Sequence, residues 1–428
     1  MKTVSYERDK KAVAEVIARR RDFYIDQEIR TKVEDIVTDV KGNGDRALGK
    51  YTERFDGVKL DDFRVSSEEL ETARREVDDS FLKSLRRAIK NVRDFHEKQL
   101  VNSWFDSSRE RMVGQQVTPL QRIGAYVPGG TAAYPSSLVM TVVPALAAGV
   151  KEIIATTPPG KDGKVNTHIL AAAAEAGVDE IYKAGGAQAI AALAYGTESL
   201  SQVDKIVGPG NIYVTAAKKI VYGTVDIDML AGPSELLVLA DETGDPDFIA
   251  ADLLSQAEHD TRAVAVLVTT SKKLAAEVEK SLSKQLKQLS RQEIAEKSLE
   301  EYGLIITVDS LQQGIKLVND FAPEHFELMI NDPFASLGLI KNAGAIFVGK
   351  YSSEPMGDYI AGPNHVLPTG GTARFSSPLN TGDFLKKSSV IYYGNKSVQR
   401  EGEDVERLAN LEGLDAHARA VSRRRRSD

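Results

Sequence analysis

The sequence of 428 residues contains no cysteine. The chain therefore cannot form disulfides, iron–sulfur clusters or thiolate zinc sites, and it has no thiol nucleophile. Any metal ion in this protein must be bound by nitrogen and oxygen atoms, such as those of histidine, glutamine and carboxylate side chains.

Long hydrophobic segments are also missing. The N-terminal residues 1–8 contain no apolar core of the kind that a secretory signal requires. The longest apolar stretch, residues 138–150, contains Pro144 and is shorter than the ~20 residues that span a bilayer. We therefore expect a cytoplasmic protein in which residues 138–150 form a buried helix.

A surplus of positive charge is absent as well. The chain has 55 lysine and arginine residues against 62 aspartate and glutamate residues, a formal net charge of −7. No broad positive field is then available to attract phosphate backbones or anionic lipids, so we expect no nucleic-acid partner and no membrane partner. The basic run at residues 423–426 is interpreted as a solvated tail.

The residues that are present predict a folded protein of more than one domain. Hydrophobic residues make up 42% of the chain, which is ordinary for a globular protein, and the length favours at least two domains with a large pocket between them. The first hundred residues have apolar positions at helical spacing. Residues 42–45 are predicted to end one helix. Ser66 and Glu69 are predicted to form a capping box that opens a long amphipathic helix through Val92.

From residue 122 onward, short apolar runs alternate with helical segments, the pattern of parallel α/β sheets. The expected strands are residues 123–127, 152–157, 180–184, 205–208, 235–240, 263–269, 303–308 and 345–348. The expected helices between them include residues 136–149, 168–177 and 187–196. The pattern predicts two similar Rossmann-like parallel-sheet domains with helical N-terminal and C-terminal extensions. The charged helical segment at residues 404–424 has little apolar surface, so we expect it to dock on another surface.

No complete G-x-G-x-x-G fingerprint follows an expected strand, so the usual sequence argument for dinucleotide binding does not apply. Two glycine turns lie between a strand and a helix, at residues 128–131 (PGGT) and 208–211 (GPGN). Their backbone amides suit a phosphate at a helix N-terminus, and a plain tight turn explains them equally well.

The histidines divide into two groups. Four of the six lie beyond residue 250 with acidic or amide neighbours: His259, His325, His365 and His417. His96 continues an amphipathic helix and His168 lies at a helix start, so both are interpreted as structural.

Gln256 and His259 lie three residues apart near the end of a helix that Asp245 and Pro246 are predicted to begin. This spacing places both side chains on one helix face, where they suit a metal ion. A polar helix end that faces solvent is the more common meaning of such a pattern.

Glu324-His325 follows Pro323, which predicts an irregular connection that presents both side chains. An adjacent carboxylate and imidazole suit two separate bases, and chance adjacency on a surface is the alternative.

Asp358 and His365 lie in a loop rich in glycine and proline, residues 357–371, where a ligand can approach the backbone closely. A polar loop without function is the alternative. Together with Gln256, His259 and a further histidine, Asp358 would complete a nitrogen and oxygen ligand set that suits zinc.

Several blocks of the sequence resemble the histidinol dehydrogenase family, in the same order along the chain. They are residues 227–235 (IDMLAGPSE), 252–259 (DLLSQAEH), 124–130 (GAYVPGG), 185–190 (GGAQAI), 207–211 (VGPGN), 322–325 (APEH) and 364–368 (NHVLP). The resemblance extends from about residue 20 to about residue 420.

The resemblance implies a zinc-assisted, NAD-dependent four-electron oxidation of L-histidinol through histidinaldehyde to L-histidine, the last step of histidine biosynthesis. The positions that match the family's zinc ligands, one ion per subunit, are Gln256, His259, Asp358 and His417. Those that match its two catalytic bases are Glu324 and His325. The substrate contacts match Ser234, Gln256, His259, His325, Asp358, His365, Glu412 and His417. The cofactor contacts match Tyr126, Gln188 and Asn211.

The family forms homodimers with an exchanged C-terminal segment, so the resemblance implies that Glu412 and His417 complete the site of the partner subunit. The expected division is an N-terminal helical arm (1–24), a first, discontinuous α/β domain (25–121 plus 240–378), a second, NAD-binding α/β domain (122–239) and a C-terminal helical dimerisation segment (379–428). The N-terminal helices are compatible with either α/β half.

Because the chain has no thiol, the aldehyde must be hydrated directly, with His325 taking the hydroxyl proton and Glu324 activating water. Two other classes of protein remain. A zinc-dependent hydrolase could use the same ligand set without NAD, and the formation of reduced cofactor from histidinol would distinguish it. A non-catalytic binding protein with two α/β lobes usually has the export signal that this sequence lacks.

Overall fold

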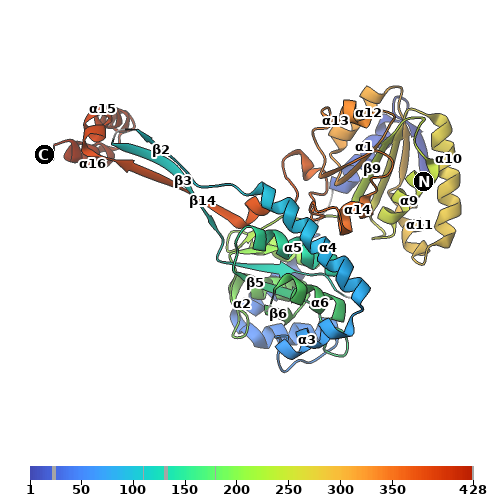
Figure 1. Cartoon of the computed structure of the whole chain (residues 1–428), viewed down its shortest axis with the longest axis horizontal. Helices are drawn as coiled ribbons and strands as arrows, with labels where there is room; N and C mark the ends of the chain where they lie inside the picture. Colours follow the sequence, from blue (N-terminus) through green and yellow to red (C-terminus); the bar gives the residue numbers. More distant parts are fainter. Residues whose placement is uncertain (22–25, 109, 130–133, 179, 427–428) are drawn as a thin grey trace.

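The computed structural model describes residues 1–428 apart from 22–25, 109, 130–133, 179 and 427–428. Figure 1 shows two α/β bodies and a long, narrow arm that extends away from them and carries the last two helices. Each body is built on its own parallel sheet, as the alternating sequence pattern predicted.

The first body contains a six-stranded parallel sheet, here called sheet A, in the order β1-β11-β10-β9-β12-β13. Its strands are β1 (Lys2–Ser5), β9 (Glu235–Ala240), β10 (Val264–Thr269), β11 (Leu304–Thr307), β12 (His325–Met329) and β13 (Ala345–Val348). Its helices are α1 (Lys10–Arg21), α9 (Pro246–Ala257), α10 (Lys272–Gln285), α11 (Gln292–Glu301), α12 (Leu311–Phe321), α13 (Pro333–Leu337) and α14 (Glu354–Tyr359). Apolar side chains of α1 and α12 pack on one face, and those of α9, α10 and α11 on the other.

The second body contains a five-stranded parallel sheet, sheet B, in the order β6-β5-β4-β7-β8. Its strands are β4 (Arg122–Tyr126), β5 (Glu152–Thr157), β6 (Glu180–Lys183), β7 (Lys205–Val207) and β8 (Asp226–Ile227). Its helices are α2 (Gln27–Asp56), α3 (Ser67–Glu76), α4 (Asp79–His96), α5 (Pro135–Ala147), α6 (Thr167–Ala176), α7 (Gly186–Tyr195) and α8 (Ile212–Val221). The helices α3 to α6 cover one face, and α2, α7 and α8 cover the other.

The packing of the N-terminal part differs from the expected division. Helices α2, α3 and α4 share their apolar cores with sheet B, whereas the division grouped residues 25–121 with residues 240–378. The first residues also do more than form a helical arm, because β1 pairs with β11 at the edge of sheet A. Helical periodicity shows that a face is apolar, but it does not identify the sheet that will cover that face.

The arm is a three-stranded antiparallel sheet in the order β14-β3-β2, which the sequence pattern did not reveal. Its strands are β2 (Trp104–Ser108), β3 (Arg111–Pro119) and β14 (Leu385–Tyr393), and it ends in α15 (Asn395–Leu411) and α16 (Asp415–Arg425). Because most side chains of β2 and β14 are exposed on both faces, these strands lack the alternation that marks a half-buried strand. The predicted helical nature of residues 404–424 is confirmed.

Most other element predictions are confirmed, including the buried helix within residues 138–150, which is α5. Residues 42–45 do not end a helix: α2 continues, kinked at Gly44, whose φ is 50°. The Glu198 carboxylate accepts a hydrogen bond from the Asp45 backbone N–H at this kink. The capping box of Ser66 and Glu69 is present, but α3 ends at Glu76 and α4 begins separately.

The remaining short helices are 3-10 turns: η1 (Glu97–Gln99), η2 (Leu286–Gln288), η3 (Thr372–Arg374) and η4 (Thr381–Phe384). Within the described part of the chain, no helix is both long enough and apolar enough to cross a membrane.

Candidate functional site

Glu324 and His325 lie at the start of β12, in the interior of sheet A. The prediction of an irregular connection is wrong for His325, which is the first residue of β12 and pairs with both β9 and β13. Both side chains are almost fully buried, with 6% of Glu324 and 4% of His325 exposed. The tight turn at Ala322, which has a φ of 51°, leads the chain into the strand. Pairing on both sides holds this strand in place despite the proline before it.

The backbone of Glu235, the first residue of β9, holds both side chains. Its N–H donates to Glu324 Oε2 at 2.8 Å, and its carbonyl lies 3.1 Å from His325 Nδ1. Because a carbonyl only accepts, Nδ1 of His325 carries the hydrogen, and Nε2 is the nitrogen that can exchange a proton. The Glu235 carboxylate in turn accepts a hydrogen bond from Gly370 N–H at 2.9 Å. Two adjacent strands and a distant loop therefore orient the pair.

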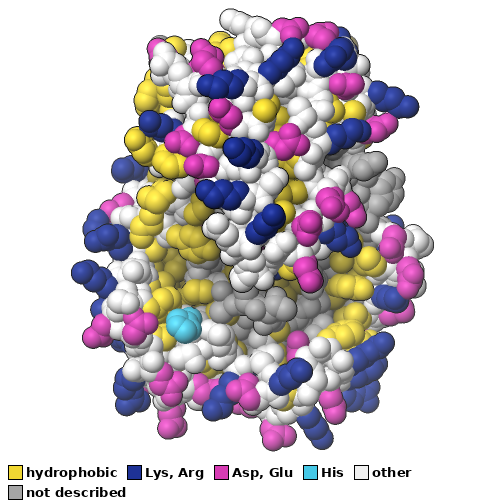
Figure 2. Space-filling view, turned by 90° about the vertical axis from the view of Figure 1, so that its right-hand side faces the viewer, with side chains coloured by type: hydrophobic (Ala, Val, Ile, Leu, Met, Phe, Trp, Pro, Cys, Tyr) yellow, Lys and Arg dark blue, Asp and Glu magenta, His cyan; other side chains and the backbone are white. Residues whose placement is uncertain are grey.

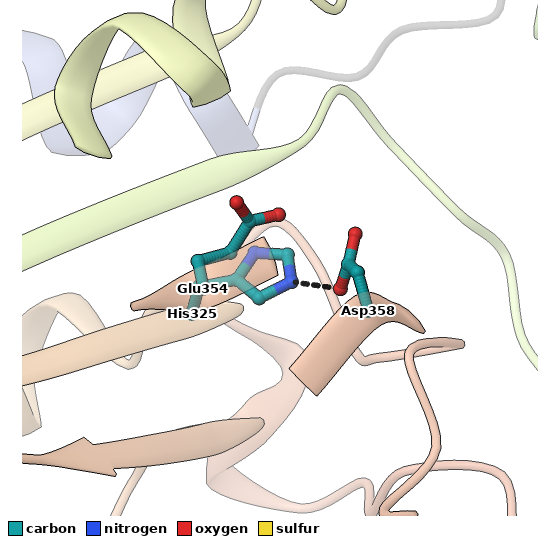
Figure 3. A group of neighbouring side chains, drawn as sticks. All are labelled: His325, Glu354 and Asp358. Carbon is teal, nitrogen blue, oxygen red and sulfur yellow. Dashed lines mark ion pairs between the residues drawn. The ribbon is translucent and has the colours of Figure 1, made fainter. Parts of the chain in front are cut away.

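Asp358 faces the free nitrogen of His325. Figure 3 shows this contact as a dashed line from Nε2 to Asp358 Oδ1, a distance of 3.6 Å. Asp358 lies in α14 and not in the loop that the sequence suggested. The carboxylate of Glu354, one turn earlier on α14, completes a group with His325 and Asp358 whose potential ligand atoms all lie within 4.8 Å of one another.

The electrostatics of the site favour an ion pair between His325 and Asp358. Burial raises the pKa of Glu324 to about 8. Burial acts to lower the pKa of His325, but the carboxylates of Glu324 and Asp358 outweigh it and raise this pKa to about 10. Burial acts to raise the pKa of Asp358, but the neighbouring imidazoles of His325 and His365 lower it to about 2. These directions favour a charged pair between the His325 imidazole and the Asp358 carboxylate.

Gln256 has the features of a metal ligand. It is 0% exposed at the end of α9, and neither its amide nitrogen nor its amide oxygen has a hydrogen-bond partner in the part of the chain that the structure describes. Such a group is costly to bury unless a ligand satisfies it. Ser255 donates a hydrogen bond to Glu354 at 3.2 Å, so this end of α9 lies against α14. The residues therefore fit a divalent cation beside Asp358.

His259 and His365 surround the same carboxylate. His259 directly follows the C-cap of α9, and the predicted start of this helix at Asp245 and Pro246 is confirmed. Partial burial lowers the pKa of His259, while the Asp358 carboxylate acts in the opposite direction. His365 Nδ1 lies 3.1 Å from the backbone carbonyl of Asp358, and burial lowers its pKa as well.

Ser234 directly precedes β9, and its carbonyl accepts a hydrogen bond from Val264 N–H at 2.9 Å. It therefore lies one residue from Glu235, the residue that orients Glu324 and His325. The structure brings this substrate-site candidate to the same edge of sheet A as the two bases.

The three cofactor-site candidates meet at the carboxyl edge of sheet B. Tyr126 ends β4, Gln188 lies in the first turn of α7 and Asn211 caps α8. The Tyr126 hydroxyl accepts a hydrogen bond from Gly186 N–H at 3.1 Å, which joins the first two positions. The strand order reverses between β4 and β7, the place where open α/β sheets bind ligands. Of the glycine turn at residues 128–131, positions 130 and 131 lie outside the described residues.

Glu412 and His417 do not reach these residues within the subunit. Both are exposed near the junction of α15 and α16, at the far end of the arm in Figure 1. Of the positions that match the family's zinc ligands, His417 therefore lies apart from Gln256, His259 and Asp358 within one subunit.

Sequence reasoning missed a second group of buried acids behind His325. Glu327 is 0% exposed on β12, and its carboxylate accepts a hydrogen bond from Glu354 N–H at 2.9 Å. Burial raises the pKa of Asp252, which is hydrogen-bonded to Glu327, to about 6. The available signal was a glutamate inside an otherwise apolar strand, as also occurs at Glu235.

Two cavities open beside the site. One of about 460 Å³ lies between the two bodies and is lined by Tyr134, His259, Arg291 and Tyr359 among others. Another of about 860 Å³ is lined by Phe347, Asp358 and His365 among others. Figure 2, which views the molecule from the side of sheet A, shows a hollow with hydrophobic side chains below a surface of interspersed charges.

Comparisons with known proteins agree with one another. The family model described as histidinol dehydrogenase matches residues 19–425. The histidinol dehydrogenase of Geobacillus kaustophilus is 56% identical over 396 residues, covering 92% of this chain and 93% of that protein. That of Bacillus subtilis is 56% identical over 401 residues, covering 94% of each. The crystal structure of histidinol dehydrogenase from Elizabethkingia anophelis has a TM-score of 0.94 and 39% identity, covering 99% of this chain and 98% of that chain.

Proposed function

Because the chain belongs to the histidinol dehydrogenase family, we propose that it oxidises L-histidinol through histidinaldehyde to L-histidine, the last step of histidine biosynthesis, in the cytoplasm. The reaction removes four electrons, so two NAD molecules are reduced for each substrate. The observation that carries the proposal is the buried Glu324–His325 pair, oriented by Glu235 and facing Asp358 in a chain without cysteine.

In this proposal one zinc ion per subunit is held by Gln256, His259 and Asp358, with His417 of the partner subunit as the fourth ligand. The unsatisfied, fully buried amide of Gln256 supports it. When bound, zinc would orient the substrate and neutralise the charge of Asp358. The substrate contacts are Ser234, His365, the metal ligands, His325 and Glu412 of the partner subunit.

His325 takes the proton of the substrate hydroxyl at Nε2, since its Nδ1–H is engaged by the Glu235 carbonyl. The first hydride then leaves the carbinol carbon for NAD. Glu324 removes a proton from the water that attacks the aldehyde, because no thiol is available to form a thiohemiacetal. The second hydride would leave the aldehyde hydrate for a second NAD while His325 Nε2 takes the proton of a hydrate hydroxyl. Burial of Glu324, which raises its pKa to about 8, suits a group that exchanges protons near neutral pH.

NAD binds in this proposal at the carboxyl edge of sheet B, with contacts from Tyr126, Gln188 and Asn211. The Gly208–Asn211 turn precedes α8, and a helix N-terminus after a glycine turn suits a phosphate, although the Asn211 side chain already accepts from Tyr213 N–H and Val214 N–H. The buried Gln188 has an amide oxygen without a partner among the described residues, which suits a ligand that donates hydrogen bonds.

We also propose a homodimer in which the arm delivers Glu412 and His417 to the partner's site. The arm exposes large apolar side chains that an isolated subunit leaves in water: Trp104, Phe105, Ile391, Tyr392, Leu408 and Leu411. Surfaces of this kind are typical of protein interfaces.

The test combines a metal assay of the purified protein with the yield of NADH per histidinol. We expect one zinc per chain, two NADH per substrate, and loss of activity after chelation. His325→Asn should suppress the oxidation of both histidinol and supplied histidinal, whereas Glu324→Gln should mainly slow the oxidation of histidinal, each by about 100-fold or more. Histidinol turnover without NADH would contradict the proposed oxidation, and equal loss of histidinal oxidation in both variants, with alcohol oxidation intact, would contradict the assigned roles.

A further inference from the structure

The carboxyl edge of sheet B contains several buried polar atoms that have no hydrogen-bond partner among the described residues. They are Asp56 Oδ2, Thr156 Oγ1, Thr157 Oγ1 and Gln188 Oε1. Thr156 and Thr157 are the last two residues of β5, and Gln188 lies in the first turn of α7. Native proteins leave few such atoms unsatisfied, so a group of them at one edge indicates a polar ligand.

Asp56 reaches this edge because α2 runs along α7 toward it. In the middle of α2, Asp45 accepts a hydrogen bond from Ser199 Oγ, in the loop that follows α7. One turn later, Gly49 lies against the ring of Phe63, whose carbonyl accepts a hydrogen bond from Lys183 N–H at the end of β6. The helix therefore passes from the amino edge of the sheet to its carboxyl edge and ends there with Asp56.

The surroundings of Asp56 belong to the proposed cofactor site. Burial raises the pKa of Tyr126 to about 12, and the Asp56 carboxylate adds to this effect. Burial also raises the pKa of Asp56 itself, to about 6, so the group is ionised at neutral pH. Lys183, the cation at the end of β6, is already paired with Glu69 at 2.8 Å. The edge therefore presents an ionised carboxylate and an amide oxygen, both of which accept hydrogen bonds.

The position of Asp56 indicates which end of a dinucleotide would meet it. After β8 the chain crosses to sheet A and its Glu324–His325 pair, whereas β6 lies at the opposite end of sheet B. A nicotinamide that reacts beside His325 must lie toward the cavity between the two bodies, which is lined by Tyr134 and Ser136 at the start of α5. The adenosine then lies toward β6 and the end of α2, where its ribose hydroxyls can donate to Asp56.

We propose that Asp56 binds the adenosine ribose hydroxyls of the dinucleotide and makes the site select NAD over NADP. This inference rests on the proposed function, because it assumes that the carboxyl edge of sheet B is the cofactor site. A carboxylate accepts hydrogen bonds from both ribose hydroxyls, as in other α/β dinucleotide sites. The 2′-phosphate of NADP would instead bring negative charge against the carboxylate.

The experiment measures binding without turnover, by calorimetric titration of the purified full-length protein with NAD, ADP-ribose and NADP. Asp56→Asn should raise the dissociation constants for NAD and ADP-ribose by about 10-fold or more, since hydrogen bonds to a charged group are lost. Its affinity for NADP should stay equal or improve, so the preference for NAD shrinks. Asp56→Glu keeps the negative charge but moves it by one methylene group. The affinity for NAD should therefore fall, while the affinity for NADP stays low.

Glu53→Gln is the matched control, because it removes one negative charge from the same helix at an exposed position. Its affinities should remain within about twofold of the unsubstituted protein. The melting temperature of Asp56→Asn should not fall, since the substitution removes a buried, unpaired charge.

The titrations separate a failure of the proposed function from a failure of the inference about Asp56. An unsubstituted protein that binds neither NAD nor ADP-ribose contradicts the proposed function. If it binds NAD but both Asp56 variants retain its affinity and its preference over NADP, the inference about Asp56 is overturned and the proposed function stands.

Discussion

At the scale of single residues, buried groups take their properties from backbone contacts as much as from neighbouring side chains. The carbonyl of Glu235 determines which nitrogen of His325 is free, and the N–H of the same residue anchors Glu324. A histidine in the same sequence context on a mobile loop would have no fixed tautomer. The register that places His325 beside Leu236 therefore has a direct chemical consequence.

Asp252 and Glu327 provide a prediction about pH and stability. Burial raises the pKa of Asp252 from 3.8 to about 6, and that of Glu327 well above its ordinary value. Because a raised carboxyl pKa means that folding favours the protonated form, this contribution to stability is full below about pH 4 and is lost as pH rises through about 6. Asp252→Asn should therefore raise the free energy of unfolding at pH 8 by about 2 kcal/mol relative to the unsubstituted protein.

The measurement is urea denaturation at pH 5 and pH 8 with a chelator present, so that metal binding does not contribute. The advantage of Asp252→Asn should be smaller at pH 5 than at pH 8. An equal difference at both pH values would show that Asp252 does not titrate in this range.

At the scale of elements, a buried ion pair holds the turn between β7 and α8. Lys218 Nζ forms an ion pair with Asp228 and donates to the Gly208 carbonyl at 3.0 Å. Asp228 accepts the Gly208 N–H at 2.7 Å. The backbone N–H and carbonyl of Gly208, which has a φ of 110°, are thus both held by side chains, one from the segment after β8 and one from α8. The turn leads directly to Asn211, a proposed cofactor contact.

Lys218→Met should destabilise the fold and loosen this turn. Removing one partner of a buried pair leaves Asp228 uncompensated, which costs about 3 to 5 kcal/mol of unfolding free energy. The dissociation constant for NAD should rise by about 10-fold, whereas zinc content should stay at the level of the unsubstituted protein. Calorimetry with NAD and a metal assay of the folded fraction provide both readouts.

Lys218→Arg retains the charge and serves as the matched control for that variant. It should keep much of the affinity for NAD. A Lys218→Met protein that is less stable but binds NAD normally would limit the ion pair to a structural role.

At the scale of the whole molecule, the arm separates residues that the proposed site requires together. Glu412 and His417 lie at its tip, whereas Gln256, His259 and Asp358 lie in the body that contains sheet A. Because β2, β3 and β14 have few buried side chains, the arm has little hydrophobic core of its own. A second subunit is the simplest acceptor for its tip.

Subunit complementation tests this exchange. His417→Ala and His325→Asn homodimers should each be nearly inactive. If the tip serves the partner's site, mixed dimers contain one site with both natural histidines, and a statistical mixture should recover about one quarter of full activity. If each subunit used its own His417, every site in the mixture would carry a substitution.

A mixture of the two variants that recovers no activity would contradict the exchanged arrangement. Glu53→Gln mixed with His325→Asn provides the reference for subunit exchange, because Glu53 is an exposed residue of α2 that has no assigned role in either site.

The local sequence pattern was sufficient to predict the elements that bury continuous apolar runs. The strand at Glu235–Ala240 and the buried helix α5 were predicted because their apolar residues must leave water whatever lies beside them. The arm was missed because its strands are stabilised by pairing with each other and not by burial, so they lack the apolar alternation of a half-buried strand, and β14 pairs with a strand far away in the sequence. The two bases were predicted by resemblance, but their place in a strand was not.

The sequence by itself determined the kinds of chemistry open to this protein, since the absence of cysteine and the six histidines follow from composition alone. It also determined the α/β class, because apolar periodicity is a local property of the chain. Only the tertiary structure decided that α2 covers sheet B, that Asp358 faces His325, and that His417 lies far from both. These are relations between segments distant in sequence, and they depend on which surfaces pack together, a choice that no short stretch of residues contains.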